Sequence, residues 1–239
     1  SDLYLRAIRP AFNQIAEATQ RLMNEGKANK VTVSCTSGFA IQWLLPRLPA
    51  FEKANAGVEV QISTTNRQVD LLSEGIDFAI RHGAGDYPGL ESECLINDKL
   101  LPVCSPRLIA SEDELSSPGD MAEYTLLHDE HRLDWALWFR ALGISDLKTD
   151  TGPVFIDSNG VIEAAIAGKG IALVRSSLIC EELKSGLLIN PLKIPVDTPI
   201  AYYLVYDESA VLQKICRRFR DWITTTATKE FPAIDKRAK

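Results

Sequence analysis

Apolar positions at the start of the chain recur every three or four residues, the period of a helix that packs along one seam. The seam consists of Leu5, Ile8, Phe12, Ile15, Thr19 and Leu22. The pattern predicts an amphipathic helix over residues 2–25 that ends at Gly26. Pro10 removes a helical hydrogen bond, so the regular helix either starts there or is kinked, and the seam on both sides favours a kink.

Alternating strand and helix patterns follow up to residue 106. Strands are predicted at 31–35, 58–63, 76–81 and 94–105, and helices at 39–55 and 69–74. Pro46 and Pro49 predict that the first of these helices is irregular. Strands and helices that alternate with short connections predict a parallel sheet with right-handed crossovers.

The second half of the chain repeats this alternation. Strands are predicted at 125–128, 153–157, 171–175 and 201–206, and helices at 134–142, 160–167, 177–186 and 209–226. The last helix has no predicted partner in this region and is expected to pack on the first. The simplest arrangement is two α/β lobes joined by two crossing strands, with a cleft between them. It divides the chain into a helix (1–26), a first lobe (27–104 and 206–239) and a second lobe (105–205).

Composition narrows the class of protein. The net charge of −6 and the lack of clustered Lys and Arg argue against a nucleic-acid surface within these residues. Five cysteines without CxxC spacing favour a reducing compartment. No apolar run approaches the roughly 20 residues of a membrane span, and no signal-peptide layout is present. Because the chain begins at Ser1 within a predicted helix, we expect it to be a fragment of a longer protein.

The ordered set of these segments resembles the effector-binding domain of LysR-type transcriptional regulators, together with the end of their linker helix. The resemblance rests on RAIRPAFNQIAEATQRL, VTVSCTSGFAIQWLLPRLPAFEKANAGVEVQIST, VDLLSEGIDFAIRHGAG, LLPVCSPRL, DSNGVIEAAIAGKGIALV and AYYLVYDES. It covers essentially the whole chain and is strongest for the subgroup of glycine-cleavage and β-lactamase regulators. One departure is Arg175, where such domains commonly have a proline.

The resemblance implies the fold and the function. The fold is α/β, with two Rossmann-like lobes of the type 2 periplasmic-binding-protein kind, joined by two crossover strands and preceded by an amphipathic linker helix. The implied function is a ligand-sensing regulatory domain in the bacterial cytoplasm. A small polar or anionic effector binds in the cleft and changes the geometry of a homodimer or homotetramer. DNA is implied as a partner through an N-terminal winged helix–turn–helix that these residues do not include; no cofactor, metal or membrane partner is expected.

Polar residues at predicted strand ends are the candidates for effector binding, because the carboxyl ends of parallel strands meet at one edge of a sheet. In the first lobe the candidates are Thr36, Ser37, Gly38, Phe39, Thr64, Thr65, Asn66, Arg81 and His82. Across the cleft, Asp157, Ser158 and Asn159 also follow a predicted strand end, and the resemblance places the second wall of the pocket there. The resemblance adds Trp135, and the second crossover strand adds Tyr202 and Tyr203. The two tyrosines alternate in a strand, so only one of them is expected to face the cleft.

Several candidates also have a purely structural interpretation. Thr36, Ser37, Ser158 and Asn159 suit helix N-caps, since hydroxyl and amide oxygens accept hydrogen bonds from free backbone N–H groups. Arg81 is equally compatible with an ion pair to Asp77 or with full solvation. Trp135 and Trp138 share a helix face and are typical of a core.

Other chemistry finds little support in the sequence. His128, Asp129, Glu130 and His131 suggest a metal site, but no nearby Cys or third His completes one. No nucleophile elbow and no GxGxxG motif is present, so an enzyme on this fold lacks a nucleophile or a cofactor anchor. The alternative from another class is a solute-binding protein of a transport system. That protein would share the cleft, but it would be exported and would not need the apolar seam on the first helix.

Overall fold

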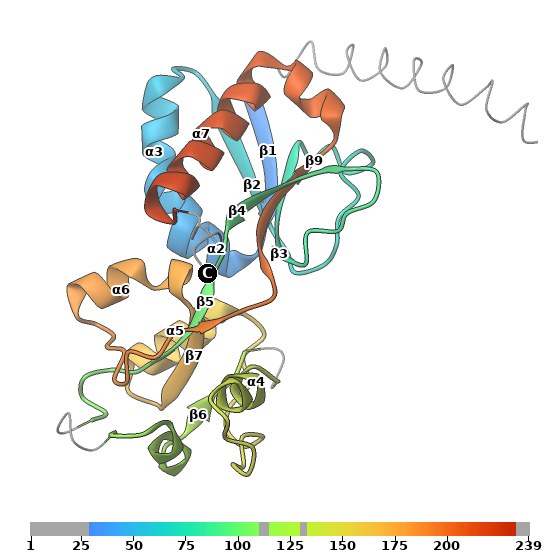
Figure 1. The fold of residues 1–239 in the computed structure, drawn as a ribbon. Coiled ribbons are helices and arrows are strands. Elements are labelled where there is room, and N and C mark those ends of the chain that lie inside the picture. The colour runs from blue at the N-terminus through green and yellow to red at the C-terminus, as the bar shows by residue number, and fades with distance from the viewer. Residues whose placement is uncertain (1–28, 110–114, 130–132, 233–239) are drawn as a thin grey trace, which may run out of the picture.

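Two β-sheets organise the chain in the computed structural model, which describes residues 29–109, 115–129 and 133–232 (Figure 1). The first sheet has five strands in the order β2-β1-β3-β9-β4, and the second has four in the order β6-β7-β5-β8. Each sheet has its own helices, so the chain forms two lobes (Figure 1). The helix predicted over residues 1–26 lies outside the described residues.

The first lobe contains the sheet with the N-terminal strands. Its strands are β1 (Lys30–Cys35), β2 (Glu59–Thr64), β3 (Phe78–Gly83), β4 (Glu91–Ile96) and β9 (Ala201–Tyr206). β1 is parallel to β2 and β3, and β9 is antiparallel to β3 and β4. The carboxyl ends of β1, β2 and β3 therefore share one edge. The apolar faces of this sheet and its helices bury Phe39, Trp43, Phe51, Phe78 and Phe219, which supply much of the hydrophobic stabilisation.

One helical segment follows β1 without interruption. It consists of α2 (Ser37–Phe39), a π-helical turn η1 (Ala40–Leu44) and α3 (Leu45–Ala54). The prediction of an irregular helix is confirmed, since a π turn precedes α3, Pro46 lies in the first turn of α3 and Pro49 lies inside it. The prediction for the last helix is also confirmed. The short 3₁₀ helix η5 (Glu208–Leu212) leads into α7 (Lys214–Glu230), which packs on the first sheet (Figure 1).

The second lobe contains β5 (Lys99–Val103), β6 (Leu126–Leu127), β7 (Ile171–Arg175) and β8 (Val196–Asp197). Its helices are η3 (Pro118–Glu123), α4 (Leu133–Ala141), α5 (Ser158–Ile166), η4 (Ser176–Leu178) and α6 (Cys180–Ser185). β6 and β7 are parallel, so their carboxyl ends also share one edge. Met121, Trp135, Trp138 and Phe139 fill the core of this lobe.

Three predicted elements differ from the structure. The single strand over 94–105 is wrong: β4 ends at Ile96 after a register shift, and β5 begins at Lys99 in the other sheet. The helix over 69–74 is wrong: residues 71–75 form a turn, because the Asp70 carboxylate accepts hydrogen bonds from the N–H groups of Leu72 and Ser73. The strand over 153–157 is reduced to one bridge between His128 and Val154.

Sheet membership also shifts the division between the lobes. The predicted boundaries at 104/105 and 205/206 assigned β5 to the first lobe and β9 to the second, whereas β5 lies in the second sheet and β9 in the first. The chain thus passes between sheets at 97–98 and again at 198–200. The physical reason is that each crossing strand pairs with only one sheet, and a periodic apolar pattern does not reveal which one.

Candidate functional site

A cavity of about 280 Å³ lies between the two lobes. It is lined by Thr36, Ser37, Gly38, Asn66, His82, Asp129, Asp134, Ile156, Asp157, Ser158, Arg175, Ile200 and Tyr202. Most of these residues follow or end a strand: β1 leads to Thr36, and Arg175 ends β7. The cavity is therefore formed where the carboxyl ends of strands from both sheets meet, the usual ligand site of open α/β sheets.

Two helix N-termini face each other at this cavity. The Thr36 hydroxyl caps the helical segment that begins at Ser37 by accepting from the N–H of Phe39 (3.3 Å), and Asp157 caps α5 by accepting from the N–H of Gly160 (3.0 Å). A Cβ atom on Gly38 would lie 3.2 Å from the Cβ of Ser158, so a glycine lets the helices approach closely. Free N–H groups at helix N-termini favour negative charge.

Among the described residues that line the cavity, Arg175 supplies a guanidinium, and its side chain is only 14% exposed. It forms ion pairs with Asp129 (3.2 Å) and Asp134 (3.9 Å), and Asp129 also accepts from the Ser158 hydroxyl (3.0 Å). Burial lowers the pKa of Arg175, but its charge interactions with Tyr202, Asp129 and Asp134 outweigh burial, and the net shift is upward. The cation is therefore permanent and held in place.

The lobes also touch each other directly across the cavity. The Nε of Arg175 in the second lobe donates to Nε2 of His82 in the first (3.1 Å), and Nδ2 of Asn66 donates to the carbonyl of Ile156 (3.2 Å). Burial and the charge of Arg175 lower the pKa of His82 to about 3, so its ring is neutral and accepts this hydrogen bond. The His82 ring packs against Tyr202, with centroids 4.8 Å apart.

The structure brings only part of the predicted set together. Those that line the cavity are Thr36, Ser37, Gly38, Asn66, His82, Asp157, Ser158 and Tyr202. Those that lie elsewhere are Phe39, Thr64, Thr65, Arg81, Trp135, Asn159 and Tyr203. Phe39 and Trp135 are buried core residues, and the indole N–H of Trp135 donates to the carbonyl of Leu127 (2.9 Å).

Strand alternation explains two of these exclusions. Arg81 neighbours His82 in β3 and therefore points to the other face of the sheet, where it donates to the Thr65 carbonyl (2.8 Å) and the Ser34 hydroxyl (2.7 Å). Tyr203 likewise points away from Tyr202. The predicted choice between the tyrosines is thus decided by the pairing of β9 with β3, which sets Tyr202 opposite His82.

Sequence reasoning missed five residues of the cavity lining: Asp129, Asp134, Ile156, Arg175 and Ile200. The rule used for the other strand ends would have found Arg175, which ends the predicted strand over 171–175. Asp129 directly follows the predicted strand over 125–128. Asp134 lies in the first turn of α4, and only the tertiary packing brings it to the cavity.

The histidine segment after β6 does not form a metal site within the described residues. His128 is buried, and its Nε2 contacts the Thr151 carbonyl at 2.8 Å. Glu130 and His131 lie outside the described residues. Among the residues that the structure describes, no group of three or more His, Cys, Asp or Glu side chains is placed to hold a metal ion.

Fold and cavity together define a two-lobed α/β domain of the periplasmic-binding-protein kind. Comparison with known proteins agrees. The family described as LysR substrate binding domain matches residues 24–228. The glycine cleavage system transcriptional activator of Escherichia coli K12 is 41% identical over 228 residues, 95% of this chain and 74% of that protein. The transcriptional activator AmpR of Rhodobacter capsulatus is 31% identical, over 93% of this chain and 75% of that protein.

A solved structure supports the same assignment. The effector domain of the transcriptional regulator AmpR of Pseudomonas aeruginosa aligns with a TM-score of 0.73 and 32% identity, over 84% of this chain and 96% of that one. The chain therefore belongs to the LysR family of transcriptional regulators, as its effector-binding domain. The predicted fold class and regulatory function are confirmed, and the transport alternative is not supported. Within the described parts of the chain, no helix has the length and apolar character that a bilayer span requires.

Proposed function

We propose that the cavity between the lobes is the effector site, and that the effector is a small polar molecule with one anionic group. The observation that carries this proposal is the pair of helix N-termini facing each other beside Ser37 and Ser158. The volume of about 280 Å³ lies near the lower limit of roughly 300–1,000 Å³ for ligand pockets, which favours a small molecule.

Charge around the cavity refines the chemistry of this effector. Among the described residues of the lining, Asp129, Asp134 and Asp157 supply carboxylates and Arg175 supplies a guanidinium, while His82 is neutral. The described carboxylates favour a ligand group that donates hydrogen bonds or is cationic. We therefore expect a ligand with two different ends. Its anionic group lies at the helix N-termini, and its opposite end donates hydrogen bonds to the carboxylates or is cationic.

Thermal-shift measurements on this chain test the proposal. The probes are α-amino acids, the matching carboxylic acids without the ammonium group, and the matching amines without the carboxylate. For a compound that raises the melting temperature, Ser37→Ala is expected to weaken binding by roughly tenfold or more, since a hydrogen bond to a charged group contributes about 1.5–3 kcal/mol. Ser158→Ala is expected to weaken binding less, because the Ser158 hydroxyl has to exchange its hydrogen bond to Asp129 for one to the ligand. Ser185→Ala, on the exposed end of α6, is the matched control. A compound whose stabilisation survives both cavity variants would show that its site is elsewhere.

Effector binding in this proposal acts by selecting between lobe arrangements. The lobes correspond to residues 29–96 with 201–232 and to residues 99–197. A ligand shifts their equilibrium only by its difference in affinity for the two arrangements. In a homodimer or homotetramer this shift would move winged helix–turn–helix domains that bind DNA. Size-exclusion chromatography with light scattering, with and without a stabilising compound, tests the effect on assembly.

The same proposal places the protein in the bacterial cytoplasm, as a regulator without catalytic activity of its own. Its support is the family, whose members are transcriptional regulators. Incubation of a stabilising compound with the chain, followed by mass spectrometry, is expected to return the compound chemically unchanged.

A further inference from the structure

The first crossover between the lobes contains a buried carboxylate, that of Asp98, which is only 4% exposed. It lies between the end of β4 and the start of β5. Its oxygens accept hydrogen bonds from the Lys99 N–H (2.9 Å), the Ser176 hydroxyl (2.7 Å), the Ser177 N–H (3.0 Å) and the Ser177 hydroxyl. Three of these donors belong to η4, which is distant in sequence, so Asp98 ties the crossover to this turn.

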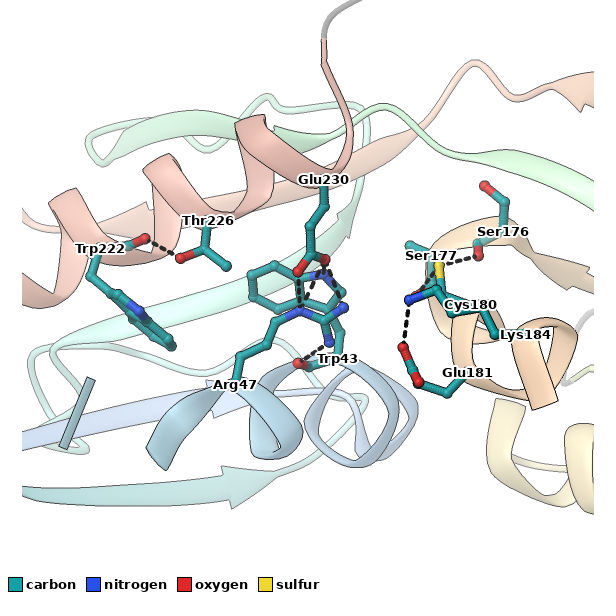
Figure 2. A network of polar contacts seen from close by, with 10 residues as sticks. All are labelled: Trp43, Arg47, Ser176, Ser177, Cys180, Glu181, Lys184, Trp222, Thr226 and Glu230. Atoms are coloured by element: carbon teal, nitrogen blue, oxygen red, sulfur yellow. Dashed lines mark hydrogen bonds and ion pairs between the residues drawn. The ribbon is translucent and has the colours of Figure 1, made fainter. Parts of the chain in front are cut away.

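The turn η4 directly follows Arg175, the guanidinium of the cavity. It also packs against η1, the π turn of the first lobe. η1 continues the helical segment whose N-terminus at Ser37 forms part of the cavity wall. In Figure 2, Ser176 and Ser177 lie on the second-lobe side of this contact, and Trp43 of η1 lies on the first-lobe side. The turn therefore has three neighbours: the cavity, the crossover and the first lobe.

We propose that Asp98 is a positioning residue that fixes η4 and thereby holds Arg175 across the cavity against His82. Any movement of the crossover then changes the position of the cavity guanidinium, and by linkage any ligand that moves the guanidinium changes the crossover. The coupling between the crossover and Arg175 is inferred from the hydrogen bonds of Asp98 alone. Its role in regulation rests on the proposed effector site.

The Asp98→Asn substitution perturbs the crossover without changing the size of the side chain. The oxygen that accepts from the Ser177 hydroxyl becomes an amide donor, so this hydroxyl has to rotate and accept instead. The remaining hydrogen bonds lose the negative charge of their acceptor and become weaker, and η4 is less well fixed. Ser177→Ala weakens the same link from the other side, because it removes one hydroxyl donor and leaves the carboxylate in place.

The pKa of His82, in the opposite lobe, measures whether Arg175 has moved, and it is determined on the folded chain. NMR titration of the histidine rings from pH 8 down to the lowest pH at which the chain stays folded shows where His82 takes up a proton, with His82→Gln used to assign the signal. In the unmodified chain the ring is expected to stay neutral at pH 5, because its pKa is about 3. In Asp98→Asn and Ser177→Ala, a displaced Arg175 removes the smaller of the two causes that lower this pKa, so the ring is expected to take up its proton at a higher pH than in the unmodified chain.

Asp207→Asn provides the matched control. Asp207 also accepts from a following serine, through the N–H (2.9 Å) and hydroxyl (2.5 Å) of Ser209, but it lies beyond β9 and away from the cavity. It is expected to leave the His82 titration unchanged even if it lowers the melting temperature.

Three outcomes would overturn the proposal. The first is a folded Asp98→Asn variant whose His82 pKa is unchanged, which would make Asp98 a structural link only. The second is an equal shift in Asp207→Asn. The third is an ordinary His82 pKa in the unmodified chain, which would contradict the contact with Arg175. If Asp98→Asn does not fold, the His82 titration of Ser177→Ala alone tests the proposal. Because no effector enters this measurement, an unsuccessful effector screen leaves its result intact.

Discussion

The carboxylate of Glu230 links the C-terminal end of α7 to the helical segment that follows β1 (Figure 2). It forms an ion pair with Arg47 (2.6 Å) and accepts a hydrogen bond from the indole N–H of Trp43 (3.1 Å). The Arg47 guanidinium also lies 4.8 Å from the Trp43 ring centroid and donates to the Trp43 carbonyl (2.7 Å). Glu230→Ala removes both carboxylate contacts and leaves the rest of the cluster in place.

The expected loss of stability follows from burial. The ion pair is partly exposed, with side-chain exposures of 15% for Arg47 and 35% for Glu230, so it contributes roughly 0.2–1 kcal/mol. Trp43 is fully buried, and a buried donor without a partner costs about 1–3 kcal/mol. We expect Glu230→Ala to lower the free energy of unfolding by about 2 kcal/mol. For a chain of this length, that corresponds to a decrease of roughly 4–8 °C in melting temperature.

Urea denaturation followed by circular dichroism measures this loss. In a Trp43→Phe background the indole donor is gone, so the cost of Glu230→Ala is expected to fall below about 1 kcal/mol. Glu181→Ala is the control, because the Glu181–Lys184 pair in the same view is largely exposed, and no change beyond experimental error is expected. Equal losses in both backgrounds would refute the role assigned to the Trp43 hydrogen bond.

Three further predictions concern other parts of the molecule. The pKa of His82 is about 3 in the folded chain and about 6.5 in the unfolded chain, so between these pH values only the unfolded chain binds the proton. The free energy of unfolding therefore decreases as the pH falls below 6.5, by up to about 1.4 kcal/mol per pH unit. In His82→Gln, urea denaturation at several pH values should show a smaller dependence of the free energy of unfolding on pH. Gly170→Ala places a Cβ 2.2 Å from the Thr125 carbonyl oxygen and should cost about 1–3 kcal/mol or more in urea denaturation, whereas Gly119→Ala, whose nearest atom lies at 3.7 Å, should cost far less. Native thiol titration with mass-spectrometric mapping should modify the exposed Cys94 before the buried cysteines, and a buried thiol reacting first would contradict the packing.

Several features of the fold could be predicted because they depend on local chemistry. The helical segment from Ser37 onward has a capping threonine, an apolar face and two prolines, and all three act within a few residues. The turn at 71–75 shows the limit of this reasoning. Leu71 and Gly75 suit a short helix, but Asp70 and the Arg67–Glu74 ion pair satisfy polar groups of the segment in a non-helical way. Competition between a side chain and the helical backbone depends on geometry that periodicity does not contain.

The residues of the candidate site could likewise be predicted only in part. The rule that strand carboxyl ends meet at one edge selected Ser37, His82 and Ser158, which line the cavity. The rule also admitted Arg81 and Thr65, which the structure places outside the lining. A strand end has two faces, and the choice between them requires knowing which face of the sheet the neighbouring elements cover.

The sequence by itself determined the class of the protein: alternating strands and helices, polar strand ends and the ordered family motifs are all properties of the order of residues. The tertiary structure alone decided how Asp129, Asp134, Arg175 and His82 form one electrostatic group, and how Asp98 reaches η4. The physical reason is distance: hydrogen bonds and ion pairs act over a few ångströms, and only the folded chain brings residues from separate segments and opposite lobes within that range.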